Sequence, residues 1–190
     1  RITDDVALIG FSTGAALSLM LAADADYPLA GLVGIATPLE FVDRNLMFAP
    51  LGHGLNKLID WFPNFDGILP FYPNDPENPT VNYRNIPTRA LYELRMLVEA
   101  MQPQLPEVHC PTLLVQGSDD PVVVPASAQA LYDRISTQEK RLHWVPSNKH
   151  GILYQDVGDT RDVIDAFLAT IDIPYPQEST APDREGAATP

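Results

Sequence analysis

One stretch near the start of the chain restricts the fold more than any other part of the sequence. Val6-Ala7-Leu8-Ile9 is a continuous apolar run that ends directly at the pentapeptide Gly10-Phe11-Ser12-Thr13-Gly14. An alanine- and leucine-rich segment follows, from Ser12 to about Ala23. A short apolar run closed by glycine predicts a strand covered on both faces, and the segment after it predicts a helix. The chain therefore enters its fold as a strand, a tight turn and a helix.

Apolar runs and amphipathic segments repeat this alternation along the chain. They predict strands at residues 32–36, 112–115 and 142–145, and helices at 126–135 and from Asp159 or Thr160 to about Ile171. Apolar side chains in the last helix recur at i, i+3 and i+4, which is the spacing of one helix face. Alternating strands and helices predict an α/β fold with a mostly parallel sheet covered by helices.

The middle of the chain departs from this alternation. Residues 37–106 separate the second predicted strand from the third, and insertions of this length are usually lids or binding loops. Apolar spacing predicts helices at 55–62 and 88–101, with a proline-rich stretch between them. We therefore expect a cap or lid inserted into the core.

The expected domain boundaries follow from these patterns. The core comprises residues 1–36 and 107–172, and the cap comprises residues 37–106. Residues 173–190 contain four prolines and few large apolar side chains, which predicts a disordered tail.

The pentapeptide has the pattern Gly-x-Ser-x-Gly in a strand–turn–helix context, which is typical of a nucleophile elbow. In such a turn the serine hydroxyl is exposed above the sheet. Gly10 and Gly14 are expected to remove Cβ atoms that would collide with the neighbouring strand and helix. The alternative is that Ser12 only caps the helix in a glycine-rich turn.

A serine nucleophile needs a base, and the base needs an orienting acid. Asp119 and Asp120 follow the strand predicted at 112–115, and His150 follows the strand predicted at 142–145. Because the carboxyl ends of parallel strands lie at one edge of a sheet, we expect these side chains to meet Ser12 there.

These three motifs together resemble the α/β-hydrolase family, in particular its carboxylesterase and monoacylglycerol-lipase-like members. The resemblance covers roughly Asp5 to Ile171 and implies the chain order nucleophile, acid, histidine. It assigns these roles to Ser12, Asp120 and His150. It favours Asp120 over Asp119, because the family's acid commonly lies three residues after the strand-closing glycine and before a small apolar pair.

Other polar residues remain as alternatives. Asp119 could be the acid, and some members of the family would instead place it at Glu40 or Asp43. We expect His143 to be a packing or surface residue, His53 a cap position, and His109 and Cys110 a partly buried connector to the next strand.

Charge and composition exclude several other classes of function. The net charge is −13 and no cluster of basic residues offsets it, so nucleic-acid binding is not expected. A single cysteine excludes an internal disulfide and a multi-cysteine metal site. No apolar run approaches the roughly 20 residues of a membrane-spanning helix. We expect no metal or organic cofactor. The oligomeric state and the compartment stay open, with the cytoplasm favoured.

The expected activity is hydrolysis of carboxylic esters with apolar acyl groups, short- or medium-chain esters or monoacylglycerols, through an acyl-enzyme. The backbone N–H of Thr13 is expected to bind the oxyanion, and Phe11 is expected to line the substrate site. The alternatives are acyl transfer by the same triad and a catalytically silent binding module of the same fold.

The family resemblance also implies a strand ahead of the elbow, with a His-Gly turn that supplies a second oxyanion donor. Residues 1–5 cannot provide it. We therefore expect the sequence to be a fragment of a longer hydrolase, with an unpaired edge at its first strand, impaired activity and poor solubility.

Overall fold

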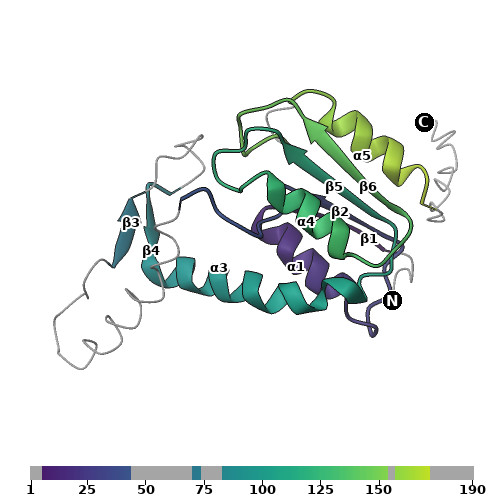
Figure 1. The fold of residues 1–190 in the computed structure, drawn as a ribbon, viewed down its shortest axis with the longest axis horizontal. Coiled ribbons are helices and arrows are strands. Elements are labelled where there is room, and N and C mark those ends of the chain that lie inside the picture. Colours follow the sequence, from purple (N-terminus) through teal and green to yellow (C-terminus); the bar gives the residue numbers. More distant parts are fainter. Residues whose placement is uncertain (1–5, 44–69, 74–82, 154–156, 172–190) are drawn as a thin grey trace, which may run out of the picture.

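The computed structural model of the chain describes residues 6–43, 70–73, 83–153 and 157–171. Within them, a parallel sheet has the strand order β1-β2-β5-β6 (Figure 1). Its strands are β1 (Ala7–Phe11), β2 (Gly31–Ile35), β5 (Thr112–Gly117) and β6 (Lys140–Val145). The predicted α/β class and parallel sheet are confirmed.

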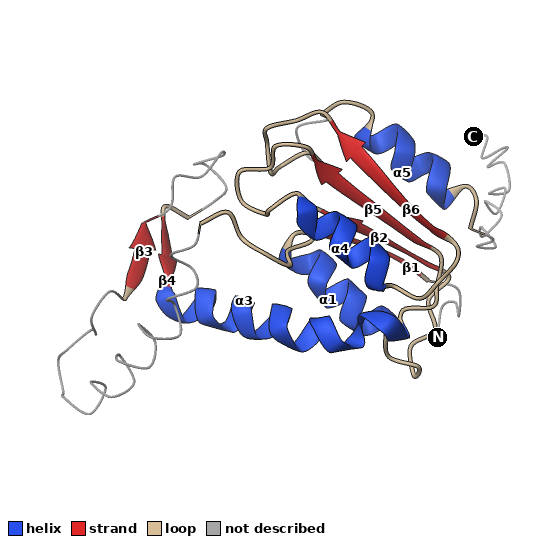
Figure 2. Cartoon of the chain, viewed as in Figure 1, coloured by secondary structure: helices blue, strands red, loops and turns tan. Residues whose placement is uncertain are grey.

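Helices cover the sheet from both sides (Figure 2). The helices are α1 (Thr13–Ala22), α3 (Thr88–Met101), α4 (Ala126–Arg134) and α5 (Thr160–Leu168), and a 3₁₀ helix, η2 (Gln102–Glu107), continues α3. One buried cluster joins Leu19 of α1 and Met101 of α3 to Leu32 and Leu114 of the sheet. A second cluster, on the opposite face, joins α5 to β2 and β5. Side chains that alternate along β2 and β5 therefore fill two separate cores.

Several predicted elements match closely. The helix predicted at 88–101 has those ends, and the strands predicted at 112–115 and 142–145 are each two residues longer in the structure. A short antiparallel hairpin of β3 (Phe71–Pro73) and β4 (Asn85–Pro87) was not predicted, because the prolines in this region argue against strands. The hairpin lies at the N-terminal end of α3 (Figure 1). The predicted helix at 55–62, His53 and the predicted tail from 173 lie outside the described residues.

The expectation that the first strand is covered on both faces was wrong for the described part of the chain. There α1 packs against one face of β1, whereas Ile9 on this strand is 50% exposed and Val6, just before it, is 40% exposed. β1 also lies at the edge of the described sheet and pairs only with β2 there. An apolar run thus identified the strand correctly but not the extent of its burial.

Candidate active site

The turn between β1 and α1 holds Ser12 in a strained backbone conformation. Ser12 has φ 52° and ψ −120°, which side-chain-bearing residues adopt rarely. The Ser12 N–H donates to the Ile35 carbonyl at 2.8 Å, and the Ser12 carbonyl accepts from Ala15 and Ala16. Its side chain makes no cap hydrogen bond, so the alternative that Ser12 only caps the helix is wrong. A strained backbone at the serine, with a side chain that does not cap the helix, is typical of a nucleophile elbow.

Only one of the two glycines in the pentapeptide is needed for close approach. A Cβ atom on Gly10 would lie 2.5 Å from the Cα of Ala15 and 2.6 Å from the carbonyl oxygen of Gly14. A Cβ atom on Gly14 would have no atom of the described residues within 4 Å. The expectation of collisions at both glycines was therefore wrong for Gly14, while Gly10 lets the strand and the helix touch.

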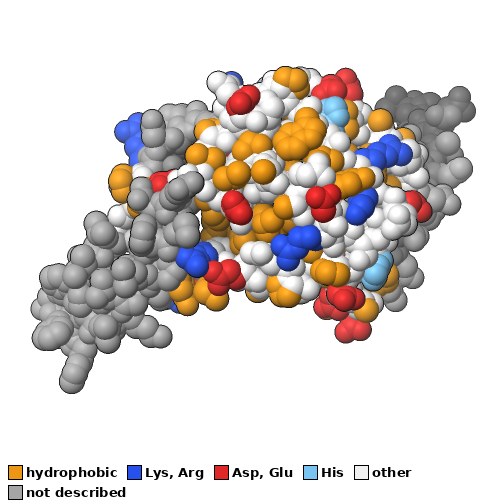
Figure 3. All heavy atoms as spheres, viewed as in Figure 1, with side chains coloured by type: hydrophobic (Ala, Val, Ile, Leu, Met, Phe, Trp, Pro, Cys, Tyr) orange, Lys and Arg blue, Asp and Glu red, His pale blue; other side chains and the backbone are white. Residues whose placement is uncertain are grey.

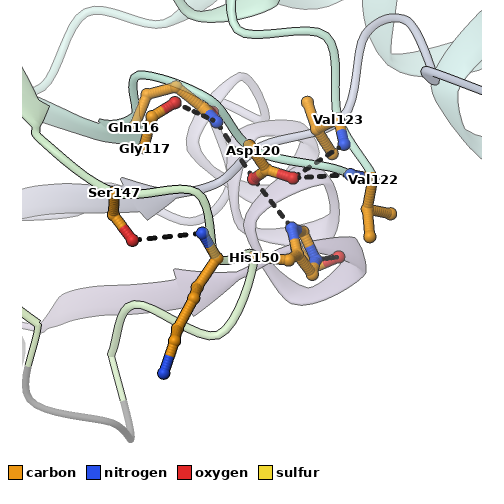
Figure 4. Close-up of polar contacts among 9 residues, drawn as sticks. Gln116, Gly117, Asp120, Val122, Val123, Ser147 and His150 are labelled. Carbon is orange, nitrogen blue, oxygen red and sulfur yellow. Dashed lines mark hydrogen bonds and ion pairs between the residues drawn. The ribbon is translucent and has the colours of Figure 1, made fainter. Parts of the chain in front are cut away.

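Asp120 lies in the turn after β5, and its carboxylate is 0% exposed. Its Oδ1 accepts the N–H groups of Val122 at 2.8 Å and Val123 at 3.0 Å. Its Oδ2 accepts from His150 Nδ1 at 2.8 Å and from Gln116 Nε2 at 3.1 Å. Figure 4 shows the carboxylate between Gln116 and His150 on one side and the two valines on the other.

These contacts determine the charge of the acid. Burial opposes ionisation of Asp120, but the hydrogen bonds from His150, Val123 and Val122 and the positive charge that His150 can carry outweigh it. The net effect lowers the pKa of the Asp120 carboxyl below its ordinary value. Asp120 is therefore a carboxylate at neutral pH.

His150 joins the acid to the serine. Because a carboxylate only accepts hydrogen bonds, Nδ1 of His150 carries the proton that Asp120 binds, and neutral Nε2 is left as an acceptor. Nε2 lies 3.0 Å from the Oγ of Ser12. The imidazole is 14% exposed, and its ring centroid lies 5.0 Å from that of Phe11. The structure thus brings Ser12, Asp120 and His150 into one hydrogen-bonded chain.

Close approach at Gly117 allows the turn that carries His150 to pack on the end of β5. A Cβ atom on Gly117 would lie 3.2 Å from the Lys149 carbonyl oxygen and 3.3 Å from that of Ser147. The Ser147 carbonyl also accepts the N–H of Asp119 at 2.9 Å. The turns after β5 and β6 are therefore fixed to each other, and so are the acid and the base.

The other candidate acids point elsewhere. Asp119 is exposed, and its carboxylate accepts from the hydroxyl of Ser118. Glu40 is exposed, and Asp43 accepts a hydrogen bond from the hydroxyl of Tyr72. Of these carboxylates, Asp120 is the one that contacts His150 in the described structure.

His143 and Cys110 lie away from the triad. His143 pairs through Nε2 with Asp159 at 2.9 Å, as a partly exposed residue of β6. Burial raises the pKa of the Cys110 thiol, which agrees with its expected place in a connector.

Gln116 is the site residue that the sequence analysis missed. It follows the apolar residues Leu113-Leu114-Val115 in β5 and is fully buried. A polar side chain at the end of a buried strand is the signal that could have identified it, because such side chains need a partner.

Thr13 is the first residue of α1, so its N–H belongs to the first turn, where the helix offers no acceptor. Among the described residues, no group of three His, Cys, Asp or Glu side chains is placed to hold a metal ion. None of the described helices is both long and apolar enough to cross a membrane.

A cavity of about 620 Å³ lies between α3, residues 39–43 and Val124–Pro125. The face of the molecule in Figure 3 is hollowed beside α3, with hydrophobic side chains inside the hollow. The residues that line it include none of the triad. The hollow is therefore separate from the hydrogen-bonded chain of Ser12, His150 and Asp120.

Comparisons with known proteins agree with this fold. A family model described as serine aminopeptidase, S33, matches residues 71–156. A carboxylesterase of Bacillus subtilis (strain 168) is 24% identical over 171 residues, which are 89% of this chain and 65% of the relative. A thermostable monoacylglycerol lipase of Bacillus sp. (strain H-257) is 31% identical over 91 residues, which are 44% of this chain and 36% of that relative.

The fold is also that of solved lipolytic enzymes. A structure of the metagenome-derived lipolytic enzymes LipS and LipT matches with a TM-score of 0.67 and 23% identity, over 87% of this chain and 64% of that one. This chain thus spans about two-thirds of the length of the carboxylesterase and of this structure. The chain thus has the α/β-hydrolase fold that the motifs predicted, and its sequence is similar to that of such hydrolases over part of its length.

The two glycines of the elbow predict opposite effects on stability. Gly10→Ala should lower the free energy of unfolding by about 1–3 kcal/mol, because its Cβ atom would overlap backbone that cannot move aside. Gly14→Ala should leave stability unchanged or raise it by up to about 1 kcal/mol, because alanine favours the helix. Urea unfolding of both variants measures the difference. Equal stability of the two variants would contradict the close approach at Gly10.

Proposed function

We propose that this protein is a serine hydrolase that cleaves carboxylic esters through an acyl-enzyme. The observation that carries the proposal is the position of the His150 ring. Its Nε2 lies 3.0 Å from Ser12 Oγ while its Nδ1 lies 2.8 Å from Asp120 Oδ2. These distances are within the reach that general-base catalysis needs.

The proposed reaction begins with proton transfer from Ser12 Oγ to His150 Nε2 as the oxygen attacks the ester carbonyl. Asp120 keeps the ring in the tautomer that can accept this proton and stabilises the imidazolium that forms. His150 then returns the proton to the departing alkoxide, which leaves the acyl group on Ser12. Water, activated by the same ring, releases the acid and restores the serine.

The negative charge of the tetrahedral intermediate needs donors that are already in place. We assign the backbone N–H of Thr13 to this role, because it lies in the first turn of α1 directly after Ser12. The helix dipole adds to the stabilisation of an anion at this end of α1. The chemistry requires no metal or organic cofactor.

The proposed substrates are esters with an apolar acyl group, of short or medium length or as monoacylglycerols. Phe11 supports this assignment, because its partly buried ring lies against His150 and presents an apolar surface next to Ser12. The names of the carboxylesterase and the monoacylglycerol lipase that resemble this chain support the same substrate class.

A fluorophosphonate probe tests the nucleophile directly. The folded protein should be labelled covalently, because the probe reacts with serine hydroxyls that an adjacent base activates. Ser12→Ala should abolish the label, and Ser18→Ala, in the helix that follows Ser12, should retain it. Mass spectrometry of the labelled peptide identifies the site. No label on folded protein would instead support a catalytically silent binding module.

Substitution of the two adjacent aspartates tests the acid. Asp120→Asn should lower kcat by about 10⁴-fold, the loss seen when a triad acid becomes an amide and favours the wrong histidine tautomer. Asp119→Asn should stay within a few-fold of the wild type, because its carboxylate points to Ser118. Steady-state hydrolysis of a p-nitrophenyl ester measures both. The reverse order of the two effects would assign the acid to Asp119.

A chain-length series of p-nitrophenyl esters tests the substrate class. We expect kcat/KM to rise from acetate to medium-length acyl groups, because each buried methylene contributes about 0.8 kcal/mol. Adding an alcohol acceptor to the same assay and analysing the products separates hydrolysis from acyl transfer. A preference for charged or peptide substrates would reject the proposed class.

A further inference from the structure

We propose that Gln116 is a positioning residue of this site. Its side-chain amide fixes the carboxylate of Asp120 and, through it, the direction in which His150 faces Ser12. Because the role is defined toward the triad, it rests on the proposed function. The proposal goes further than the proposed function, because it assigns the orientation of Asp120 to a fourth side chain, which belongs to β5.

Gln116 contacts the same oxygen of Asp120 that His150 contacts. Its Nε2 donates to Oδ2 of Asp120 at 3.1 Å, and the same oxygen accepts from His150 Nδ1 at 2.8 Å. The other oxygen is occupied by the N–H groups of Val122 and Val123 (Figure 4). Four donors thus converge on one carboxylate.

A carboxylate has about four lone-pair positions for hydrogen-bond donors. The two valine N–H groups fill one oxygen, and Gln116 fills one position on the other. One position remains, and His150 occupies it. Without the amide donor, Oδ2 would offer two positions, and the ring of His150 could rotate between them. Gln116 therefore selects a single orientation of the base.

The burial of Gln116 supports a role other than packing. Its side chain is fully buried, and its Oε1 has no hydrogen-bond partner among the described residues. An unsatisfied buried acceptor costs stability, so an apolar residue would suit packing better. The opposite orientation of the amide would bring Oε1 against the carboxylate, where two acceptors would face each other. The orientation that donates to Asp120 is thus the favourable one.

The chemistry of an amide also fits the position. Glutamine donates a hydrogen bond without carrying a charge. It therefore orients Asp120 without forming an ion pair that would replace the one between Asp120 and the imidazolium of His150. An ionised glutamate would repel Asp120 across the same distance, and a methionine of similar length would supply no donor. The two substitutions therefore separate loss of the donor from loss of side-chain volume.

The first measurement is the effect of Gln116→Met on turnover of a p-nitrophenyl ester. We expect kcat to fall about tenfold, the effect of one lost hydrogen bond to a charged group, with KM unchanged because the amide does not face substrate. Thr37→Val is the matched control. Thr37 is 3% exposed, follows β2 at the same end of the sheet, and also carries a buried oxygen without a partner among the described residues. It should stay within about twofold of the wild type, as expected where no hydrogen bond is lost.

The second measurement is the pH profile of Gln116→Glu. At low pH a protonated glutamic acid donates to Asp120 and should restore kcat above that of Gln116→Met at the same pH. As the pH rises, the carboxyl of the introduced glutamate ionises and can no longer donate a hydrogen bond to Asp120. The ratio of its kcat to that of the wild type should therefore fall. A packing role would give no such pH-dependent rescue. This variant also decides the question if Gln116→Met does not fold.

The third measurement does not depend on turnover. The Nδ1–H proton of His150 should give a sharp, slowly exchanging NMR signal in the wild type and in Thr37→Val, and a broadened signal in Gln116→Met. If fluorophosphonate fails to label the wild type, the proposed hydrolase function fails, yet this signal still tests Gln116. Wild-type kcat together with an unchanged His150 signal in folded Gln116→Met would overturn the role. Equal losses of kcat in Gln116→Met and Thr37→Val would overturn it as well.

Discussion

One imidazole ring joins the ends of three strands, and the candidate site depends on this connection. His150 follows β6, Asp120 follows β5 and Ser12 follows β1, and the ring bonds to the other two through its two nitrogens. These residues are separated by up to 138 positions in the chain. They meet because all strands of the described sheet run in the same direction and end at the same edge. Parallel pairing thus converts distant sequence positions into neighbours.

The strained backbone at Ser12 is held by the packing around it. The Ser12 N–H is bound to β2 through the Ile35 carbonyl, and the first turn of α1 is bound to the Ser12 carbonyl. Gly10 allows the backbone of α1 to approach the strand closely enough for both contacts. Strain of this kind costs about 1–3 kcal/mol and persists only where the surroundings fix it. The conformation that exposes the hydroxyl is therefore a property of three elements together.

The sequence predicted those parts of the molecule that depend on local chemistry. The Gly-x-Ser-x-Gly turn, the helix at 88–101 and the turn of Asp119 and Asp120 each carry their own signal in residue type and spacing. Burial of β1 was predicted wrongly, because it depends on which elements lie above the strand. Gln116 was missed for a similar reason, since its meaning comes from a partner four positions away across a turn. A contact such as this one, between a strand residue and a turn residue, can be recognised only once the conformation of the turn is known.

The backbone segment that binds the Asp120 carboxylate is itself paired with another part of the chain. The segment Val122–Val124 donates two N–H groups to Asp120 and also pairs with residues 40–42. In that pairing the Val42 N–H donates to the Val122 carbonyl, and the Val124 N–H donates to the Glu40 carbonyl, both at 2.9 Å. Residues 40–42 follow β2 and lie within residues 37–106, which the sequence analysis predicted to be a cap. Because the backbone that binds the carboxylate is the backbone that this segment holds, a displacement of residues 40–42 would be transmitted to Asp120 by hydrogen bonds alone. Gln116 binds the same carboxylate from β5, so Asp120 is held between that strand and the segment that pairs with residues 40–42.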